Sequence, residues 1–188
     1  FKQIQPKLMF AVDGYPYGGK RYDRIPIIRE LQQSLPTLEN TVLVSYLNTD
    51  SSTEKLENTC LWNDLLSEKT DLVYEQVPFN HPMWVLYSSG TTGLPKALVH
   101  SQGGILLEFH KFLGLHANLK PGDRFFWFST TGWIMWNIMQ GGLLLGATSL
   151  LYDGNPGYPD LDVIWNFAEK SKMTFFGTSA AYLTACMN

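Results

Sequence analysis

Apolar residues along the chain gather in short runs that alternate with amphipathic segments, which predicts strands and helices in turn. Runs rich in β-branched or aromatic side chains, ended by glycine, proline or polar turn residues, are typical of buried strands. Such runs predict strands at 7–12, 41–47, 84–88, 97–100, 124–129, 148–152 and 174–176. Apolar residues spaced three and four positions apart indicate helices instead. Helices are expected at 26–31, 60–67, 104–115, 134–145, 161–171 and 180–187.

From Trp84 onward, the predicted strands and helices alternate along the chain. Such alternation is typical of an α/β fold, in which a mostly parallel, layered sheet is flanked by helices. In two segments, the apolar residues show no regular spacing. Residues 14–24, rich in glycine, tyrosine and basic side chains, are interpreted as a loop. The polar, serine-rich residues 48–58 are interpreted as a surface loop or a weak subdomain boundary.

Composition excludes several classes of protein. Only 16% of the 188 residues are charged, against roughly 25% in a typical soluble domain, and 14% are aromatic, unlike a disordered chain. A net charge of −3 argues against a sequence-independent nucleic-acid binder. The sequence shows no membrane span, no signal-peptide pattern and no metal or redox spacing among its cysteines and histidines. We therefore expect a cytoplasmic protein without a metal site of its own.

The most informative stretch is a loop rich in glycine and hydroxyl side chains, which joins two predicted strands. Glycines let backbone N–H groups converge on one point, while hydroxyls and a lysine add donors and a positive charge, so the loop suits nucleotide phosphates and a leaving pyrophosphate. Its spacing excludes the GxxxxGK[ST] loop of P-loop NTPases. A plain surface loop is the alternative, which the position between two apolar strands disfavours. The candidate phosphate ligands are Ser88, Ser89, Gly90, Thr91, Thr92, Gly93 and Lys96.

Four segments of the chain resemble one group of enzymes. YSSGTTGLPK at 87–96 resembles the phosphate-loop motif of the adenylate-forming superfamily, which includes acyl-CoA synthetases, luciferases and the adenylation domains of peptide synthetases. Together with this loop, DGYPYGGKRYDR at 13–24, STTGWIMWN at 129–137 and LLYDGNPGYPD at 150–160 look like the acetoacetyl-CoA synthetase family. The resemblance covers most of the chain and is weakest across residues 48–75.

This resemblance implies a two-step reaction. A carboxylate, here acetoacetate, attacks the α-phosphorus of ATP to give an acyl-adenylate and pyrophosphate, and the thiol of coenzyme A then displaces AMP. The resemblance also implies Mg²⁺ carried on the ATP phosphates, and Thr92 and Lys96 as catalytic residues. Another short- or medium-chain acid is the alternative substrate. A non-catalytic nucleotide-binding module is the alternative from a different functional class.

The resemblance extends to a pocket for the acyl group. Trp133, Ile134 and Met135 match the residues that line this pocket in acetyl-CoA synthetases. Met135 replaces the threonine of the acetate pattern, which is compatible with a different short acid such as acetoacetate. Simple core packing is the alternative interpretation for Trp133 and Trp136.

A glycine-rich loop that meets the coenzyme A phosphates in acetyl-CoA synthetases matches Gly18, Gly19, Lys20 and Arg21. Tyr17 stands where the family has one of two arginines, so Lys20, together with Arg21, would supply the positive charge for the coenzyme A phosphates. A solvated basic turn is the alternative interpretation. His100, which follows the phosphate loop, could approach the nucleotide, but we interpret it as a structural histidine.

Other motifs of the superfamily do not occur in the chain, which has no QTE or TGD sequence. The 188 residues are therefore interpreted as a fragment of the AMP-binding N-terminal domain, without the C-terminal lid domain and inactive alone. The remaining parts of the parent chain are then expected partners, and the oligomeric state stays open. Apolar faces such as 134–145 should be exposed unless those parts or a second copy cover them.

Overall fold

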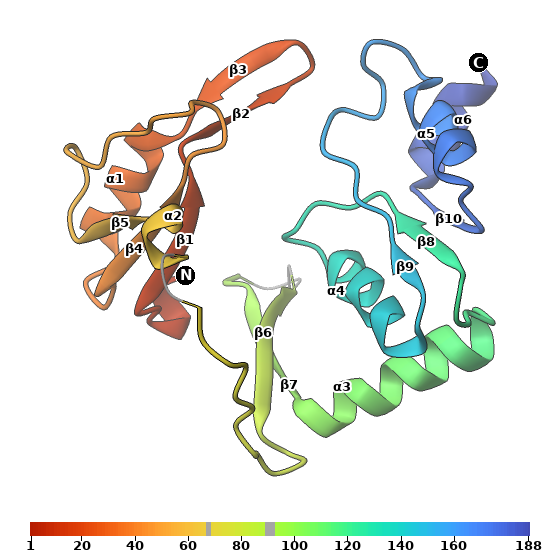
Figure 1. The fold of residues 1–188 in the computed structure, drawn as a ribbon, viewed down its shortest axis with the longest axis horizontal. Coiled ribbons are helices and arrows are strands. Elements are labelled where there is room, and N and C mark those ends of the chain that lie inside the picture. Colours follow the sequence, from red (N-terminus) through yellow and green to blue (C-terminus); the bar gives the residue numbers. More distant parts are fainter. Residues whose placement is uncertain (67–68, 89–92) are drawn as a thin grey trace. The chain divides into compact units, whose positions relative to one another are not determined.

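The computed structural model describes residues 1–66, 69–88 and 93–188, and the chain divides into two compact units. The first unit is Phe1–Tyr74 and the second is Glu75–Asn188 (Figure 1). Residues 48–58, interpreted above as a weak boundary, lie inside the first unit, where Gln32 bonds to the backbone of Glu57.

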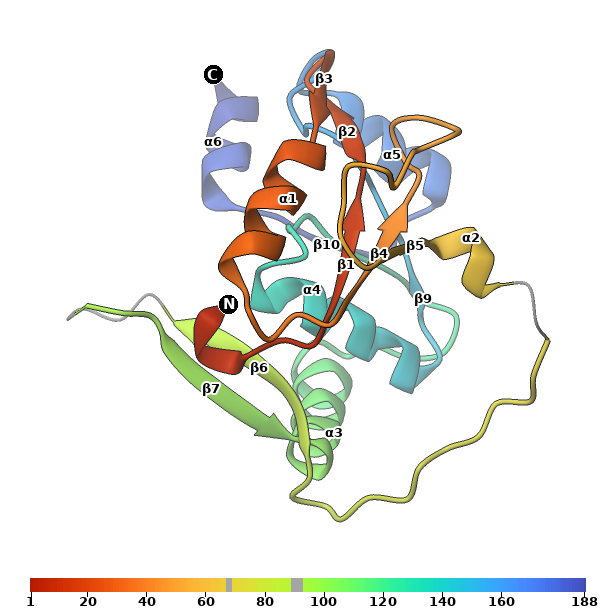
Figure 2. The ribbon, with the colours of Figure 1, turned by 90° about the vertical axis from the view of Figure 1, so that its left-hand side faces the viewer.

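The first unit is built on a three-stranded parallel sheet in the order β1-β4-β5, beside which α1 lies (Figure 2). The elements in and around this sheet are η1 (Lys2–Ile4), β1 (Leu8–Val12), α1 (Ile25–Ser34), β4 (Asn40–Val44), β5 (Thr59–Leu61) and α2 (Trp62–Leu65). The strand predicted at 7–12 and the helix predicted at 26–31 are confirmed. Four apolar side chains are buried here: Ile28 of α1, Leu35 at the C-cap of this helix, and Val42 and Leu43 of β4. The helix and the central strand therefore form the core of the unit.

The loop interpretation of residues 14–24 is wrong, because these residues form an antiparallel hairpin of β2 (Gly14–Tyr17) and β3 (Lys20–Asp23). Gly18 and Gly19 connect the strands with φ of 57° and 77°. A two-residue turn with positive φ at both positions matches the twist of a hairpin and favours glycine. Tyr15 and Tyr22 stack across the strands with ring centroids 5.6 Å apart.

Two other predictions in the first unit need correction. The helix predicted at 60–67 is a strand at its start, because Cys60 pairs with Val42 in the parallel sheet before the short helix α2 begins at Trp62. The strand predicted at 41–47 ends at Val44. The chain turns there so that the N–H groups of Tyr46 and Leu47 reach a buried carboxylate.

The second unit contains a second parallel sheet, in the order β10-β8-β9. The strands of the second unit are β6 (Pro82–Ser88), β7 (Lys96–Ser101), β8 (Arg124–Trp127), β9 (Thr148–Ser149) and β10 (Phe175–Gly177). Its helices are α3 (Gln102–Phe109), which continues as the π-helix η2 (His110–His116), α4 (Ile134–Gly141), which continues as η3 (Gly142–Leu145), α5 (Val163–Ser171) and α6 (Ala180–Met187). All the elements predicted here occur, although β8 and β9 are shorter than 124–129 and 148–152.

Adjacent phenylalanines of β8 show that helices cover both faces of this sheet. Phe125 belongs to a core cluster with Phe109 of α3 and Met139 of α4, whereas Phe126 belongs to a separate cluster with Ile164 of α5. Successive side chains of a strand point to opposite faces, so each cluster lies between the sheet and one helical layer. The layered α/β fold with a parallel sheet and flanking helices is therefore confirmed, while the β2–β3 and β6–β7 pairs are antiparallel.

Within the described part of the chain, none of the helices combines the length and apolar character that crossing a membrane would need.

A single buried carboxylate organises the end of the first sheet. Asp13 is 1% exposed and follows β1 directly. Its Oδ1 accepts hydrogen bonds from the N–H groups of Tyr46 and Leu47 at 2.7 and 2.8 Å. Its Oδ2 accepts from the backbone and side chain of Asn48 and from the hydroxyl of Ser51, at 2.8–2.9 Å. Burial acts to raise the pKa of Asp13, but these donors outweigh it and lower the pKa to about 2.

Asp13→Asn should lower the unfolding free energy of the first unit by about 2 kcal/mol at pH 7, since the pKa falls from 3.8 to about 2 on folding. Because the folded pKa is the lower one, this advantage is complete above about pH 4 and is lost as the pH falls through 2. Urea unfolding of the full-length protein, followed by hydrogen exchange at the Leu47 and Asn48 amides, measures the difference.

The exposed Asp23, whose Oδ1 accepts from the Ile25 N–H at 2.9 Å, provides the control, since the amide oxygen of asparagine can accept the same bond. Asp23→Asn should change the free energy by less than about 0.5 kcal/mol at either pH. A deficit of the Asp13 variant that is as large at pH 2 as at pH 7 would show that the charge is not what stabilises this loop.

Candidate functional site

The predicted phosphate loop joins β6 and β7, which pair as an antiparallel hairpin in the second unit. Ser88 at the end of β6 lies opposite Lys96 at the start of β7. Opposite residues of a pair project their side chains on the same face, so the hydroxyl and the ammonium flank the loop together. Four of the predicted ligands, Ser89, Gly90, Thr91 and Thr92, lie outside the described residues.

The described end of the loop shows why glycine stands at position 93. Gly93 has φ of +122°, a conformation that side-chain-bearing residues rarely adopt. A Cβ built there would meet no atom of the described residues within 4 Å, so the backbone conformation is what favours glycine. Lys96 is exposed after this turn, and neither ion pair found among the described residues includes it. Its charge is therefore available to an anionic ligand.

The base of the hairpin is anchored to the core through a tryptophan. The ring of Trp84 lies 5.8 Å from that of Phe109 of α3, and its Nε1–H donates to Nδ1 of His100 at 2.9 Å. An indole can only donate, so Nδ1 of His100 acts as the acceptor. This contact agrees with a structural role for His100. Ser101 then caps α3 by accepting from the Gly104 N–H, so the hairpin leads directly into a helix.

The three residues predicted to line the acyl pocket lie together where α4 begins. Trp133 is the N-cap of α4 and is 50% exposed, and Ile134 and Met135 are half-buried in the first turn. None of the three belongs to either core cluster, whereas Trp136 packs against the cluster that contains Phe109. Core packing therefore accounts for Trp136 and leaves the Trp133 side chain available for a ligand.

The residues predicted to bind coenzyme A form the tip of the β2–β3 hairpin in the first unit. Gly18 and Gly19 make the turn, and Lys20 follows it as an exposed residue paired with Tyr17. Arg21 has a structural contact, because its Nη2 donates to the Leu47 carbonyl at 3.0 Å and to Asn48 Oδ1 at 3.2 Å. Neither cation takes part in the two ion pairs observed among the described residues, but Arg21 is held by these hydrogen bonds, so Lys20 is the one left to meet a ligand.

Sequence reasoning missed Arg24, which fixes the base of this hairpin. The guanidinium carbon of Arg24 lies 4.8 Å from the ring centroid of Tyr15 and 5.5 Å from that of Tyr22, and Arg24 also donates to the Tyr15 hydroxyl. The placement of Tyr15 and Tyr22 on either side of the Gly-Gly turn could have predicted that the two rings stack across a hairpin. Such a cluster holds a hairpin in a defined orientation.

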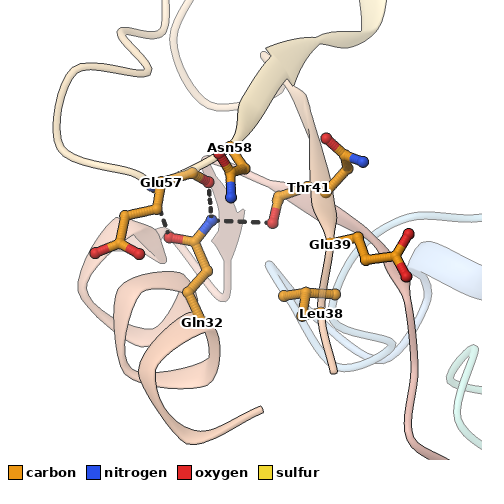
Figure 3. A pocket seen from close by; sticks show the side chains of 7 residues that line it. Gln32, Leu38, Glu39, Thr41, Glu57 and Asn58 are labelled. Atoms are coloured by element: carbon orange, nitrogen blue, oxygen red, sulfur yellow. Dashed lines mark hydrogen bonds between the residues drawn. The ribbon is translucent and has the colours of Figure 1, made fainter. Parts of the chain in front are cut away.

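Gln32 of α1 was also missed, and it ties the helix to β4 and to the loop before β5 (Figure 3). Its Nε2 donates to Thr41 Oγ1 at 3.0 Å and to the Glu57 carbonyl at 2.7 Å, while its Oε1 accepts from the Glu57 N–H at 3.1 Å. The polar cavity beside it measures about 30 Å³, which is room for one water molecule. This cavity is therefore structural and too small for a substrate.

A family model described as "AMP-binding enzyme" matches residues 1–188. The chain belongs to this family. It is 39% identical over 189 residues to "Acetoacetyl-CoA synthetase" of Danio rerio, covering 96% of this chain and 28% of that protein. It is 43% identical over 188 residues to "Acetoacetyl-coenzyme A synthetase" of Rhizobium meliloti (strain 1021), covering 98% of this chain and 29% of that protein.

A solved structure is also similar to this AMP-binding chain. "Acetoacetyl-CoA Synthetase from Streptomyces lividans" matches with a TM-score of 0.91 and 54% identity, covering 98% of this chain and 28% of that one. The resemblance inferred from the four segments is therefore confirmed. The chain spans less than a third of the length of the relatives that it matches.

Proposed function

We propose that the protein containing this chain is an ATP-dependent acid–thiol ligase that joins acetoacetate to coenzyme A. The observation that carries the proposal is the near-complete match of the chain to acetoacetyl-CoA synthetases, at up to 54% identity in a solved structure. Family membership supports the use of ATP, and the β6–β7 hairpin supports a site for its phosphates.

In the proposed first step, a carboxylate oxygen of acetoacetate attacks the α-phosphorus of ATP, and the bond to the β-phosphate breaks to release pyrophosphate. The carboxylate and the triphosphate repel each other, so the site must supply positive charge and N–H or O–H donors. The exposed Lys96 and the half-buried Ser88 flank the loop that would supply them. We assign Thr92 and Lys96 to this step, with the other loop residues as phosphate ligands.

Mg²⁺ enters this proposal as part of the MgATP substrate. Among the described residues, no three His, Cys, Asp or Glu side chains gather where they could hold a metal ion. The hydroxyl and lysine side chains that flank the loop suit phosphate oxygens better than a divalent cation.

In the proposed second step, the thiol of coenzyme A attacks the acyl carbon, and the bond from that carbon to the AMP oxygen breaks. Trp133, Ile134 and Met135 would hold the acyl group, which their common position at the start of α4 supports. Gly18, Gly19 and Lys20 would meet the coenzyme A phosphates, with Arg21 orienting the hairpin. We further propose a cytoplasmic enzyme, which the free thiols of Cys60 and Cys186 support.

A carboxylate panel on the full-length protein tests the proposed substrate. Acetoacetate should promote exchange of labelled pyrophosphate into ATP with a kcat/KM at least about 10-fold higher than acetate or butyrate, because butyrate lacks the ketone oxygen that a matched site would recognise. Thioester formation with coenzyme A should follow the same order. Equal rates for all three acids would favour a general short-chain synthetase, and binding of ATP without exchange would favour a non-catalytic module.

A matched pair of lysine variants separates the two proposed steps. Lys96→Gln should lower acetoacetate-dependent ATP–pyrophosphate exchange by about 100-fold, because a charge that stabilises the leaving pyrophosphate is lost. Lys20→Gln should leave this exchange within about twofold and raise the KM for coenzyme A about 10-fold, because only the second substrate loses a contact. Both variants are compared by steady-state kinetics of the full-length protein.

The exposed Lys120, which lies in the turn before β8, is the control for the loss of a surface charge. Lys120→Gln should change neither parameter by more than about twofold. If Lys96→Gln behaved like Lys120→Gln, the assignment of the hairpin to the phosphates would be wrong. If Lys20→Gln slowed pyrophosphate exchange and left the KM for coenzyme A unchanged, the assignment of the β2–β3 turn would be wrong.

A further inference from the structure

The two strands of the β6–β7 hairpin change their register close to the base of the hairpin (Figure 2). At the base, Pro82 lies opposite Ser101. The next pair along the strands is Trp84 opposite His100, which is two residues further on β6 and one residue further on β7. Met83 is therefore an extra residue on β6, as in a β-bulge. From this point to the loop, every pairing is shifted by one residue.

The extra residue decides which side chain lies opposite Lys96. With the bulge at Met83, Lys96 lies opposite Ser88. If the strands instead continued from their base pair without a bulge, Lys96 would lie opposite Tyr87. Successive side chains of a strand project on opposite faces, so the Ser88 hydroxyl would then lie on the face away from the ammonium. The bulge therefore brings together the two side chains that flank the candidate phosphate loop.

The apolar pattern of the two strands does not by itself select this register. Residues 83–86 read Met-Trp-Val-Leu and residues 97–99 read Ala-Leu-Val, so both strands carry apolar side chains on both faces. A shift by one residue would keep apolar side chains opposite one another, whereas in a strand with one polar face it would turn that face inward. A specific contact must therefore fix the position of the bulge.

The base of the hairpin is fixed separately, by the start of α3. The Gln102 N–H donates to the His81 carbonyl at 2.8 Å, and the Gly103 N–H donates to the Phe79 carbonyl at 2.9 Å. These bonds tie the end of β7 to the residues before β6, so the pairing at the base is held in place. The extra residue must therefore be taken up between the base and the loop.

The side-chain contact next to the bulge is the hydrogen bond from Trp84 Nε1 to His100 Nδ1, at 2.9 Å. In the shifted register Trp84 would lie opposite Val99, whose side chain cannot accept the indole N–H. We propose that this bond locks the bulge at Met83 and makes His100 a positioning residue for the phosphate loop. The catalytic consequence rests on the proposed function, whereas the register can be tested without any activity.

Disulfide trapping in the full-length protein, with the linked peptides identified by mass spectrometry, reports the register directly. The pair Leu86→Cys and Leu98→Cys, opposite each other in the observed register, should cross-link at least about 10-fold more than Val85→Cys with Leu98→Cys. Adding His100→Leu should reduce this preference to about threefold or less, because the acceptor of the lock is lost. Adding His100→Asn should retain it, because the amide oxygen can accept the indole N–H. A preference that survives His100→Leu, or that is lost in both variants, would overturn the proposal.

Acetoacetate-dependent ATP–pyrophosphate exchange by the full-length protein measures the catalytic consequence. His100→Leu should lower kcat of this exchange about 10-fold, and His100→Asn should restore it to within about threefold of the unaltered protein. His110→Leu, which changes an exposed histidine at the start of η2, is the control and should change kcat by less than about twofold. If His100→Leu lost the register but exchanged normally, the positioning role would be wrong. If the unaltered protein showed no exchange, the proposed function would fail, and the disulfide result alone would decide whether the lock exists.

Discussion

The cross-strand register of β6 and β7 is the constraint on which the candidate site depends. It sets Ser88 opposite Lys96, so the glycine- and hydroxyl-rich loop begins and ends at neighbouring points. Such a loop has few large side chains with which to pack, so its position must come from the strands that carry it. Trp84 supplies that support, because it packs on Phe109 and bonds to His100 on the opposite strand. A change in this register would separate the lysine from the hydroxyls that precede it.

The first unit depends on a different interaction, the buried carboxylate of Asp13. Its oxygens hold the loop that follows β4, and the same loop accepts the guanidinium of Arg21 from the β2–β3 hairpin. The basic turn at Gly18–Gly19 is therefore oriented by a chain of polar contacts that begins at one ionised group. In both units, two antiparallel strands are joined by a glycine-containing segment, and an exposed lysine begins the second strand. An exposed lysine in this position can attract an anionic ligand to a site that stays open to water.

The parts of the fold that depend on local pattern could be predicted from sequence. The spacing of apolar residues along the chain predicts β1, α1 and the helices of the second unit, because burial of one face of an element imposes that spacing. Long-range pairing could not be predicted in the same way. Cys60 is in a strand because Val42 lies beside it, and the 14–24 hairpin has no clean alternation of apolar and polar residues. The role of Asp13 was hidden because its partners lie 33–38 positions later in the chain.

The candidate site was found from the order of its residue types, which the sequence displays directly. The order of residue types alone predicts the phosphate loop, the residues at the start of α4 and the Gly-Gly turn, and their assignment to ligands stays a prediction. What the sequence could not show is which neighbouring side chains serve the structure instead. His100 and Arg21 both have structural partners, and Trp136 belongs to the core. Only their contacts in the folded chain distinguish these residues from Lys96, Lys20 and Trp133.

The most direct test of the proposed chemistry follows one oxygen atom. Acetoacetate labelled with ¹⁸O in its carboxyl group is incubated with the full-length protein, ATP and coenzyme A, and the products are analysed by mass spectrometry. If the carboxylate attacks the α-phosphorus and the thiol then displaces AMP, one labelled oxygen must appear in AMP and none in pyrophosphate. Label in orthophosphate, accompanied by ADP in place of AMP, would contradict the adenylate-forming reaction on which this account rests.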